Sequence, residues 1–229
     1  MEKRFERAAK DMTRLPEEEE AIFFRFKKDI AVPDGKTVLE YHLPVLEAPD
    51  GRILARDIFL RVKGSQKVCI IGKNGAGKTT LLRKMAGELL RRTDIHAAYM
   101  PQNYEELLEL DQTPVEYLAS SGDKEELTRI RTYLGSLKYT ADEMEHSVRE
   151  LSGGQKAKVL LLKMSLSGAD VLILDEPTRN FSPLSNPVIR EVLKGFGGAV
   201  LSISHDRKYI AEVCDTVYEL RKEGLCKIR

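Results

Sequence analysis

Residues 72–79 form a glycine-rich segment between an apolar run and a run with helical spacing. In order they are Gly72, Lys73, Asn74, Gly75, Ala76, Gly77, Lys78 and Thr79. The apolar run 68–71 is short enough for a buried strand, and residues 80–86 place their apolar side chains on one side of a helix. A strand, a glycine loop and a helix in this order predict an α/β fold with a phosphate-binding loop.

The segment fits the pattern G-x-x-x-x-G-K-[ST] at every fixed position. Glycines let backbone amides turn inward around phosphate oxygens, and the helix N-terminus adds partial positive charge. The Lys78 ammonium is expected to reach the β- and γ-phosphates of a nucleotide, and the Thr79 hydroxyl is expected to ligate Mg²⁺. Thr80, the next residue, belongs to the same predicted nucleotide site. The alternative is a chance glycine turn, and the matching strand and helix argue against it.

Composition indicates a folded protein without a bulk charge that would select a partner. The chain has 229 residues, with 37 basic and 36 acidic side chains, so net charge favours neither nucleic acid nor a membrane surface. Its three cysteines are scattered without metal-binding spacing, which is typical of reduced thiols. No apolar run approaches membrane-span length and the N-terminus is charged. We therefore expect a cytoplasmic protein without direct membrane insertion.

The N-terminal residues differ from the rest of the chain. Residues 1–13 have helical composition, and Lys3, Arg7, Lys10 and Arg14 are spaced to line one helix face. Such a stripe could contact RNA phosphates. A solvated helix or linker is the favoured interpretation, because charge runs usually face water.

Strand-like segments precede the glycine loop. Residues 38–43 and 58–62 are predicted strands, and the turn residues 49–51 lie between them. They predict an N-terminal antiparallel β-subdomain.

A helical insertion is predicted after the short strand 97–100. Residues 103–150 are rich in Glu, Leu and Lys and lack strand signals. Thr113 and Thr140 are expected helix N-caps there. With the helix that follows, the helical subdomain spans about residues 103–168.

Two carboxylates follow the most apolar strand of the sequence. Residues 171–174 are Val-Leu-Ile-Leu and predict a strand buried on both faces of a parallel sheet. Ligands of such sheets bind beyond the carboxyl ends of the strands, where Asp175 and Glu176 emerge. Asp175 is expected to hold the hydration shell of Mg²⁺, and Glu176 to orient or deprotonate an attacking water. The alternative is an acidic cap or turn after a core strand.

Two further polar residues end predicted strands. His205 follows the strand 199–203, where a neutral imidazole could donate to a γ-phosphate oxygen. Gln102 follows the strand 97–100, where its amide oxygen could meet the metal or the water. A lone histidine here is usually structural and a lone glutamine usually lies on the surface, so both assignments depend on the neighbouring motifs.

A second glycine-rich motif lies at residues 151–155, Leu-Ser-Gly-Gly-Gln. Ser152 and Gln155 fit the capping box S-x-x-Q before a long apolar helix. Gly153 and Gly154 leave the first-turn amides uncovered, so a phosphate can approach them closely. The alternative is an ordinary capped helix that contains two glycines.

From about residue 30 to residue 229, the chain resembles an ATP-binding cassette (ABC) nucleotide-binding domain, in which these motifs occur in the same order. The resemblance implies a P-loop NTPase core within residues 21–229. It implies ATP and Mg²⁺ as ligands, with Thr79, Gln102 and Asp175 around the metal, and Glu176, His205 and Gln102 as catalytic residues. It also implies a head-to-tail dimer, in which the phosphate loop of one cassette closes over ATP against residues 152–155 of the other.

Several details resemble the ABC-F group, soluble twin-cassette proteins that act on the ribosome. Residues 204–207, Ser-His-Asp-Arg, resemble the histidine motif of that group, and the stretch between Lys78 and Leu151 is short for a transporter cassette. Residues 14–26 resemble the junction after its interdomain linker, which makes residues 1–20 the end of a linker helix. The resemblance implies that this chain is the second cassette of a longer protein, or a fragment of one. It also implies another cassette, the ribosome and tRNA as partners, and a role in translation or antibiotic resistance. The alternative is the nucleotide-binding subunit of an ABC membrane transporter.

The chain departs from the family pattern in two places. Residues 179–182 are Arg-Asn-Phe-Ser where the group usually has Asn-His-Leu-Asp, so Ser182 replaces an aspartate that helps to couple the two sites. A non-hydrolysing nucleotide switch is therefore a third hypothesis. Residues 46–49 offer no aromatic side chain for stacking on adenine, so weak base selectivity is expected.

Overall fold

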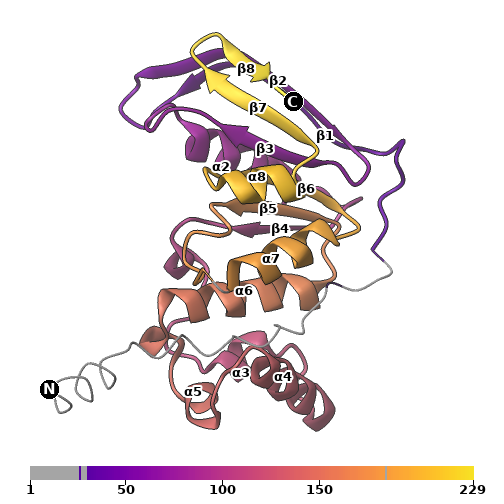
Figure 1. Cartoon of the computed structure of the whole chain (residues 1–229), viewed down its shortest axis with the longest axis vertical. Coiled ribbons are helices and arrows are strands. Elements are labelled where there is room, and N and C mark those ends of the chain that lie inside the picture. Colours follow the sequence, from indigo (N-terminus) through magenta and orange to yellow (C-terminus); the bar gives the residue numbers. More distant parts are fainter. Residues whose placement is uncertain (1–25, 27–29, 184) are drawn as a thin grey trace, which may run out of the picture.

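The computed structural model describes residue 26, residues 30–183 and residues 185–229. The predicted linker helix at residues 1–20 and its basic stripe lie outside the described residues. Figure 1 shows a layered α/β molecule, with a β-ribbon at one end and a group of short helices at the other.

The N-terminal strands form the predicted antiparallel pair, β1 (Thr37–Glu47) and β2 (Ile53–Lys63). Both strands are longer than the sequence indicated, because exposed residues such as Pro44 and Glu47 in β1 and Arg56 in β2 lie on the outer face beside buried neighbours. The turn between them is held by backbone hydrogen bonds from Ala48 N to Arg52 O and from Gly51 N to Ala48 O, both 2.9 Å long.

The central sheet has six strands in the order β4-β5-β6-β3-β7-β8. All neighbouring pairs are parallel except β7 and β8, which are antiparallel. The strands are β3 (Lys67–Ile71), β4 (Ala97–Met100), β5 (Val171–Asp175), β6 (Ala199–Ile203), β7 (Thr216–Arg221) and β8 (Gly224–Lys227). The predicted strands β3 to β6 are confirmed, and the C-terminal strands β7 and β8 were not predicted.

Helices cover both faces of this sheet. They are α2 (Lys78–Leu89), α6 (Gly153–Ser167), α7 (Ser185–Lys194) and α8 (Arg207–Val213). Strand β5 is buried throughout: Val171 and Ile173 join the core that contains α2 and the ribbon, while Leu172 and Leu174 join the core under α6. The continuous apolar run of β5 therefore reflects burial on both faces.

The region between β4 and α6 contains short helices, as the sequence predicted. They are η1 (Tyr104–Glu106), α3 (Pro114–Leu118), α4 (Lys124–Ser136), α5 (Ala141–Glu145) and η2 (Val148–Glu150). Thr113 and Thr140 form the predicted N-caps, each in a complete capping box. In the part of the chain that the structure describes, no helix combines the length and the apolar character needed to cross a membrane.

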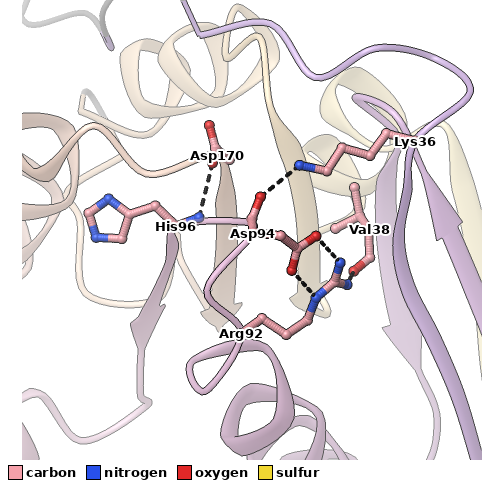
Figure 2. Close-up of polar contacts among 6 residues, drawn as sticks. All are labelled: Lys36, Val38, Arg92, Asp94, His96 and Asp170. Atoms are coloured by element: carbon pink, nitrogen blue, oxygen red, sulfur yellow. Dashed lines mark hydrogen bonds and ion pairs between the residues drawn. The ribbon is translucent and has the colours of Figure 1, made fainter.

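A polar cluster ties the ribbon to the loop between α2 and β4 (Figure 2). Arg92 forms an ion pair with Asp94, and its guanidinium also donates to the Val38 carbonyl of β1. Lys36 Nζ donates to the Asp94 carbonyl over 2.8 Å. These contacts join the end of α2 to the start of β1, which helps to hold the ribbon against the sheet.

Candidate functional site

A cavity of about 370 Å³ lies beyond the carboxyl ends of the parallel strands. It collects most of the residues that the sequence analysis assigned to nucleotide, metal or catalysis: Asn74, Gly75, Gly77, Lys78, Thr79, Thr80, Gln102, Asp175, Glu176 and His205. They meet because β3, β4, β5 and β6 are parallel neighbours, and their carboxyl ends therefore open at one edge. Gly72, Lys73 and Ala76 belong to the same loop and do not line the cavity.

The phosphate loop requires glycine at specific positions. Gly75 and Gly77 have φ angles of 77° and 95°, in the left-handed region that favours glycine. A Cβ atom on Gly77 would also lie 2.7 Å from Leu54 Cδ1, because the end of the ribbon packs on the loop. Helix α2 begins directly after Gly77 without a side-chain cap or an acidic residue in its first turn. Its amides are therefore open to an anion.

Lys78 is held inside the loop. Its Nζ atom donates to the carbonyl oxygens of Gly72, over 2.8 Å, and Lys73, over 3.1 Å. The side chain is buried, and no described carboxylate forms an ion pair with it. The ammonium thus has uncompensated positive charge at the point where a phosphate would lie.

Asp175 and Glu176 are both buried at the end of β5. Neither carboxylate oxygen of Asp175 has a hydrogen-bond partner among the described residues. Burial raises the pKa of Asp175, and the nearby Thr79 hydroxyl opposes that shift. Burial also raises the pKa of Glu176 to about 7, while the backbone N–H of His205 acts in the opposite direction. At both carboxyls the effect of burial therefore exceeds that of the neighbouring donors and cations.

The backbone of Glu176 is in the left-handed region, with φ at 55°. This conformation is uncommon for a residue other than glycine and is concentrated at functional sites. It lets the chain turn directly after β5, where Glu176 N donates to the Ile203 carbonyl of β6 over 2.9 Å. The Glu176 side chain thereby lines the same cavity as Asp175.

The donor set at this end of the cavity fits Mg²⁺. Thr79, Gln102 and Asp175 offer a hydroxyl, an amide and a carboxylate oxygen, and Mg²⁺ prefers oxygen ligands. Among the described residues no cluster of three or more His, Cys, Asp and Glu side chains could hold a metal ion by itself. Mg²⁺ usually keeps waters and phosphate oxygens in its shell, so the unpartnered Asp175 fits a metal that arrives with a nucleotide.

His205 lies against Glu176 in the structure. Its Nδ1 atom is 2.9 Å from Glu176 Oε1, while the ring is about two-thirds exposed at the cavity edge. The sequence predicts a contact from His205 to a γ-phosphate oxygen, and the contact with Glu176 is visible only in the structure. The position allows the imidazole to orient the carboxylate and to face a ligand in the cavity.

The second glycine-rich motif lies on a separate surface. Ser152 caps α6: its hydroxyl accepts from Gln155 N over 3.3 Å, and Gln155 Oε1 accepts from Ser152 N over 2.9 Å. This confirms the predicted capping box. Ser152, Gly153, Gly154 and Gln155 do not line the cavity. The described chain therefore carries two potential phosphate surfaces that do not face each other across one cavity.

Ser182 has a structural role in the segment that departs from the family pattern. Its hydroxyl accepts from Ser185 N over 3.1 Å and its carbonyl accepts from Asn186 N over 3.0 Å, at the start of α7. Serine is a favourable residue for such a cap. In the same segment, the Asn180 carbonyl lies 3.0 Å from where a Cβ on Gly154 would be. Close packing against this carbonyl explains a glycine at position 154.

Helix η1 lies within the predicted helical region, and it forms ion pairs that the sequence did not indicate. Glu105 pairs with Lys156 of α6 over 3.0 Å. Glu106 pairs with Arg83 of α2 through two contacts, 2.7 and 2.9 Å long. Because η1 follows Gln102 closely, these pairs connect that strand end to both glycine-rich motifs. Surface ion pairs between distant segments leave no spacing signal in the sequence.

Comparisons with known proteins find similar sequences and a similar fold. A family model described as "ABC transporter" matches residues 55–179. The chain is 32% identical over 232 residues to ABC transporter F family member 2 of Arabidopsis thaliana, covering 95% of this chain and 34% of the relative. It is 32% identical over 174 residues to the probable ATP-binding protein YheS of Escherichia coli (strain K12), covering 73% of this chain and 27% of the relative. The chain thus spans about a third of the length of the curated relatives it matches.

A solved structure shares the fold. It is a dimeric post-hydrolysis state of an ATP-binding cassette bound to ADP and Pi, with a TM-score of 0.65 and 19% sequence identity. The alignment covers 87% of this chain and 98% of that one. At this identity the likeness shows the fold alone.

Proposed function

The chain belongs to the ABC transporter family, and from this premise we propose that it binds ATP with Mg²⁺ in the cavity of about 370 Å³ and hydrolyses it to ADP and phosphate. One observation supports the proposal most strongly. Two buried carboxyls with raised pKa values lie in the same cavity as a buried, unpaired lysine and uncapped helix amides. Perturbed acids beside an anion site are typical of phosphoryl transfer.

The residues of the cavity have different roles in ATP binding and hydrolysis. The amides of residues 74–79 and the Lys78 ammonium bind the phosphates. Thr79, Asp175 and Gln102 hold Mg²⁺, which when bound neutralises negative charge on the phosphate oxygens. Glu176 accepts a proton from the attacking water, and a pKa near 7 suits a base that works at neutral pH. The backbone N–H of His205 donates to Glu176 Oε2, which leaves a ring N–H of His205 to donate to a γ-phosphate oxygen.

A second cassette completes the site. Residues 152–155 present uncovered glycine amides on another surface of the same chain, outside the cavity. A head-to-tail arrangement of two cassettes places those amides over the phosphates of the opposite cavity. The partner is a second copy of this chain or another cassette of the same protein.

We propose further that the protein is a cytoplasmic, ribosome-associated factor in translation or antibiotic resistance. Two observations support this role: the similarity to ABC transporter F family members, and the resemblance of residues 204–207 to the histidine motif of the ABC-F group. The test is to separate ribosomes from a cell lysate by sedimentation in the presence of ATP. The tagged protein is compared with its Glu176→Gln variant, which is expected to retain ATP. We expect the variant to accumulate in ribosome fractions. Absence from those fractions, together with copurification of a membrane permease, would contradict the role and support the transporter alternative.

A further inference from the structure

The cavity has two chemically different ends. Gln102, Asp175 and Glu176 line one end, where the proposed function assigns the metal and the attacking water. At the other end the cavity is lined by Ala48, Arg52 and Leu54, which come from the tip of the β1–β2 ribbon. The phosphate loop lies between these two ends of the cavity. When the phosphates of a nucleotide bind the loop and face the carboxylates, the nucleoside part extends toward the ribbon.

The ribbon end is fixed relative to the phosphate loop. Leu54 packs on Gly77, where a Cβ would be only 2.7 Å from Leu54 Cδ1. The turn that carries Arg52 is closed by the hydrogen bond from Ala48 N to Arg52 O, and Arg52 N donates to Asp50 Oδ1 over 3.1 Å. The position of the Arg52 side chain beside the cavity therefore follows from a well-bonded turn.

Arg52 is the side chain at this end that can recognise a base. Ala48 and Leu54 offer apolar surface and no hydrogen-bonding side-chain atoms. Arg52 is exposed, and none of the described carboxylates forms an ion pair with it. Its guanidinium is planar and weakly hydrated, which suits stacking on an aromatic face.

We propose that Arg52 stacks on the nucleobase and, with Ala48 and Leu54, forms a base site that recognises the face of a purine and not its edge. The proposal rests on the proposed nucleotide-binding function. Stacking depends on ring area, so purine triphosphates bind more tightly than pyrimidine triphosphates. Among the described residues that line this end, Arg52 is the polar side chain that can reach the base edge, so ATP and GTP bind with similar affinity, within about threefold.

Calorimetric binding to the full chain tests the proposal, using the Mg²⁺ complexes of ATP, GTP, CTP and tripolyphosphate. Arg52→Ala is expected to weaken ATP and GTP alike, by about five- to tenfold, and to leave tripolyphosphate unchanged. Arg52→Tyr is expected to restore ATP and GTP binding, because a tyrosine ring supplies the lost stacking face. Arg56→Ala is the matched control, since Arg56 is exposed on strand β2, which begins directly after Arg52, and does not line the cavity.

Three results would overturn the proposal. Equal weakening of tripolyphosphate would make Arg52 a phosphate ligand. Unchanged ATP affinity in Arg52→Ala would remove it from the site, and a preference for ATP over GTP above tenfold would require recognition of the base edge. Failure of the unmodified chain to bind ATP would instead contradict the proposed function, so the two failures are distinguishable.

Discussion

Glu176→Gln is expected to lower ATP turnover by at least about 100-fold while ATP affinity changes little. Glutamine keeps the size and hydrogen-bonding reach of the side chain but cannot accept the proton of the attacking water. Turnover is measured by phosphate release and affinity by calorimetry. Glu47→Gln, an exposed residue at the end of β1, is the matched control and should leave both unchanged.

The raised pKa of Glu176 adds a pH dependence. Burial raises this pKa from 4.5 to about 7, so the basic form is lost as the pH falls below 7 and turnover should fall with it. The folded state binds this proton more tightly than the unfolded state between pH 4.5 and 7, so the group lowers stability as the pH rises through that window. Glu176→Gln should therefore raise the free energy of unfolding at pH 8 and have little effect at pH 4.5.

Two outcomes would contradict this account of Glu176. Turnover within tenfold of the unmodified chain would remove Glu176 as the base. If Glu176→Gln changed the free energy of unfolding equally at pH 8 and pH 4.5, burial would not make ionisation of the Glu176 carboxyl unfavourable in the folded state.

Lys78→Ala is expected to weaken ATP binding by at least about 30-fold, because truncating one partner of a buried charge pair costs about 2–5 kcal/mol. In the structure the ammonium is buried and bonded only to the carbonyls of Gly72 and Lys73 among the described residues. Alanine would leave those carbonyls facing the phosphates without an intervening cation. The measurement is calorimetric titration with Mg²⁺-ATP.

Lys84→Ala provides the control for Lys78→Ala. Lys84 is exposed on the same helix and does not line the cavity, so its loss removes one charge without touching the site. ATP affinity should stay within about twofold. Unchanged affinity in Lys78→Ala, or equal loss in both variants, would refute the direct contact between Lys78 and phosphate.

Much of the site was predictable because its residues follow strands that have a clear apolar pattern in the sequence. A buried parallel strand appears as a continuous apolar run, and the next residue necessarily emerges at the carboxyl edge. Gln102, Asp175, Glu176 and His205 all follow such runs, and the structure brings them into one cavity. The capping box at Ser152 was predictable for a similar reason, since its partners are only three residues apart.

The remaining features depend on contacts between distant segments. Strands β7 and β8 are interrupted by charged residues, so their apolar pattern is weak. The left-handed backbone of Glu176 is imposed by its bond to Ile203, and no local residue preference indicates it. Arg52 enters the cavity only because the ribbon packs on Gly77, which no spacing in the sequence reveals.

The central claim is that each cavity is completed by residues 152–155 of a different cassette, and mixing two inactive variants tests it most directly. Lys78→Ala weakens ATP binding in its own cavity but keeps the surface formed by residues 152–155, the glycine surface. Gly153→Asp keeps the cavity and places a carboxylate on the glycine surface, where a Cβ has ordinary space, 3.9 Å from the nearest Asn180 atom. Aspartate is also favourable in the first turn of a helix, so α6 should still form.

The measurement is the ATPase rate of an equimolar mixture, compared with each variant alone. Each variant alone should be inactive, and the mixture should recover up to about a quarter of the unmodified rate, because half of the random pairs hold one intact site of two. A mixture no more active than its components would contradict completion by a second copy of this chain. Full activity of Gly153→Asp alone would contradict a role for that surface in hydrolysis altogether.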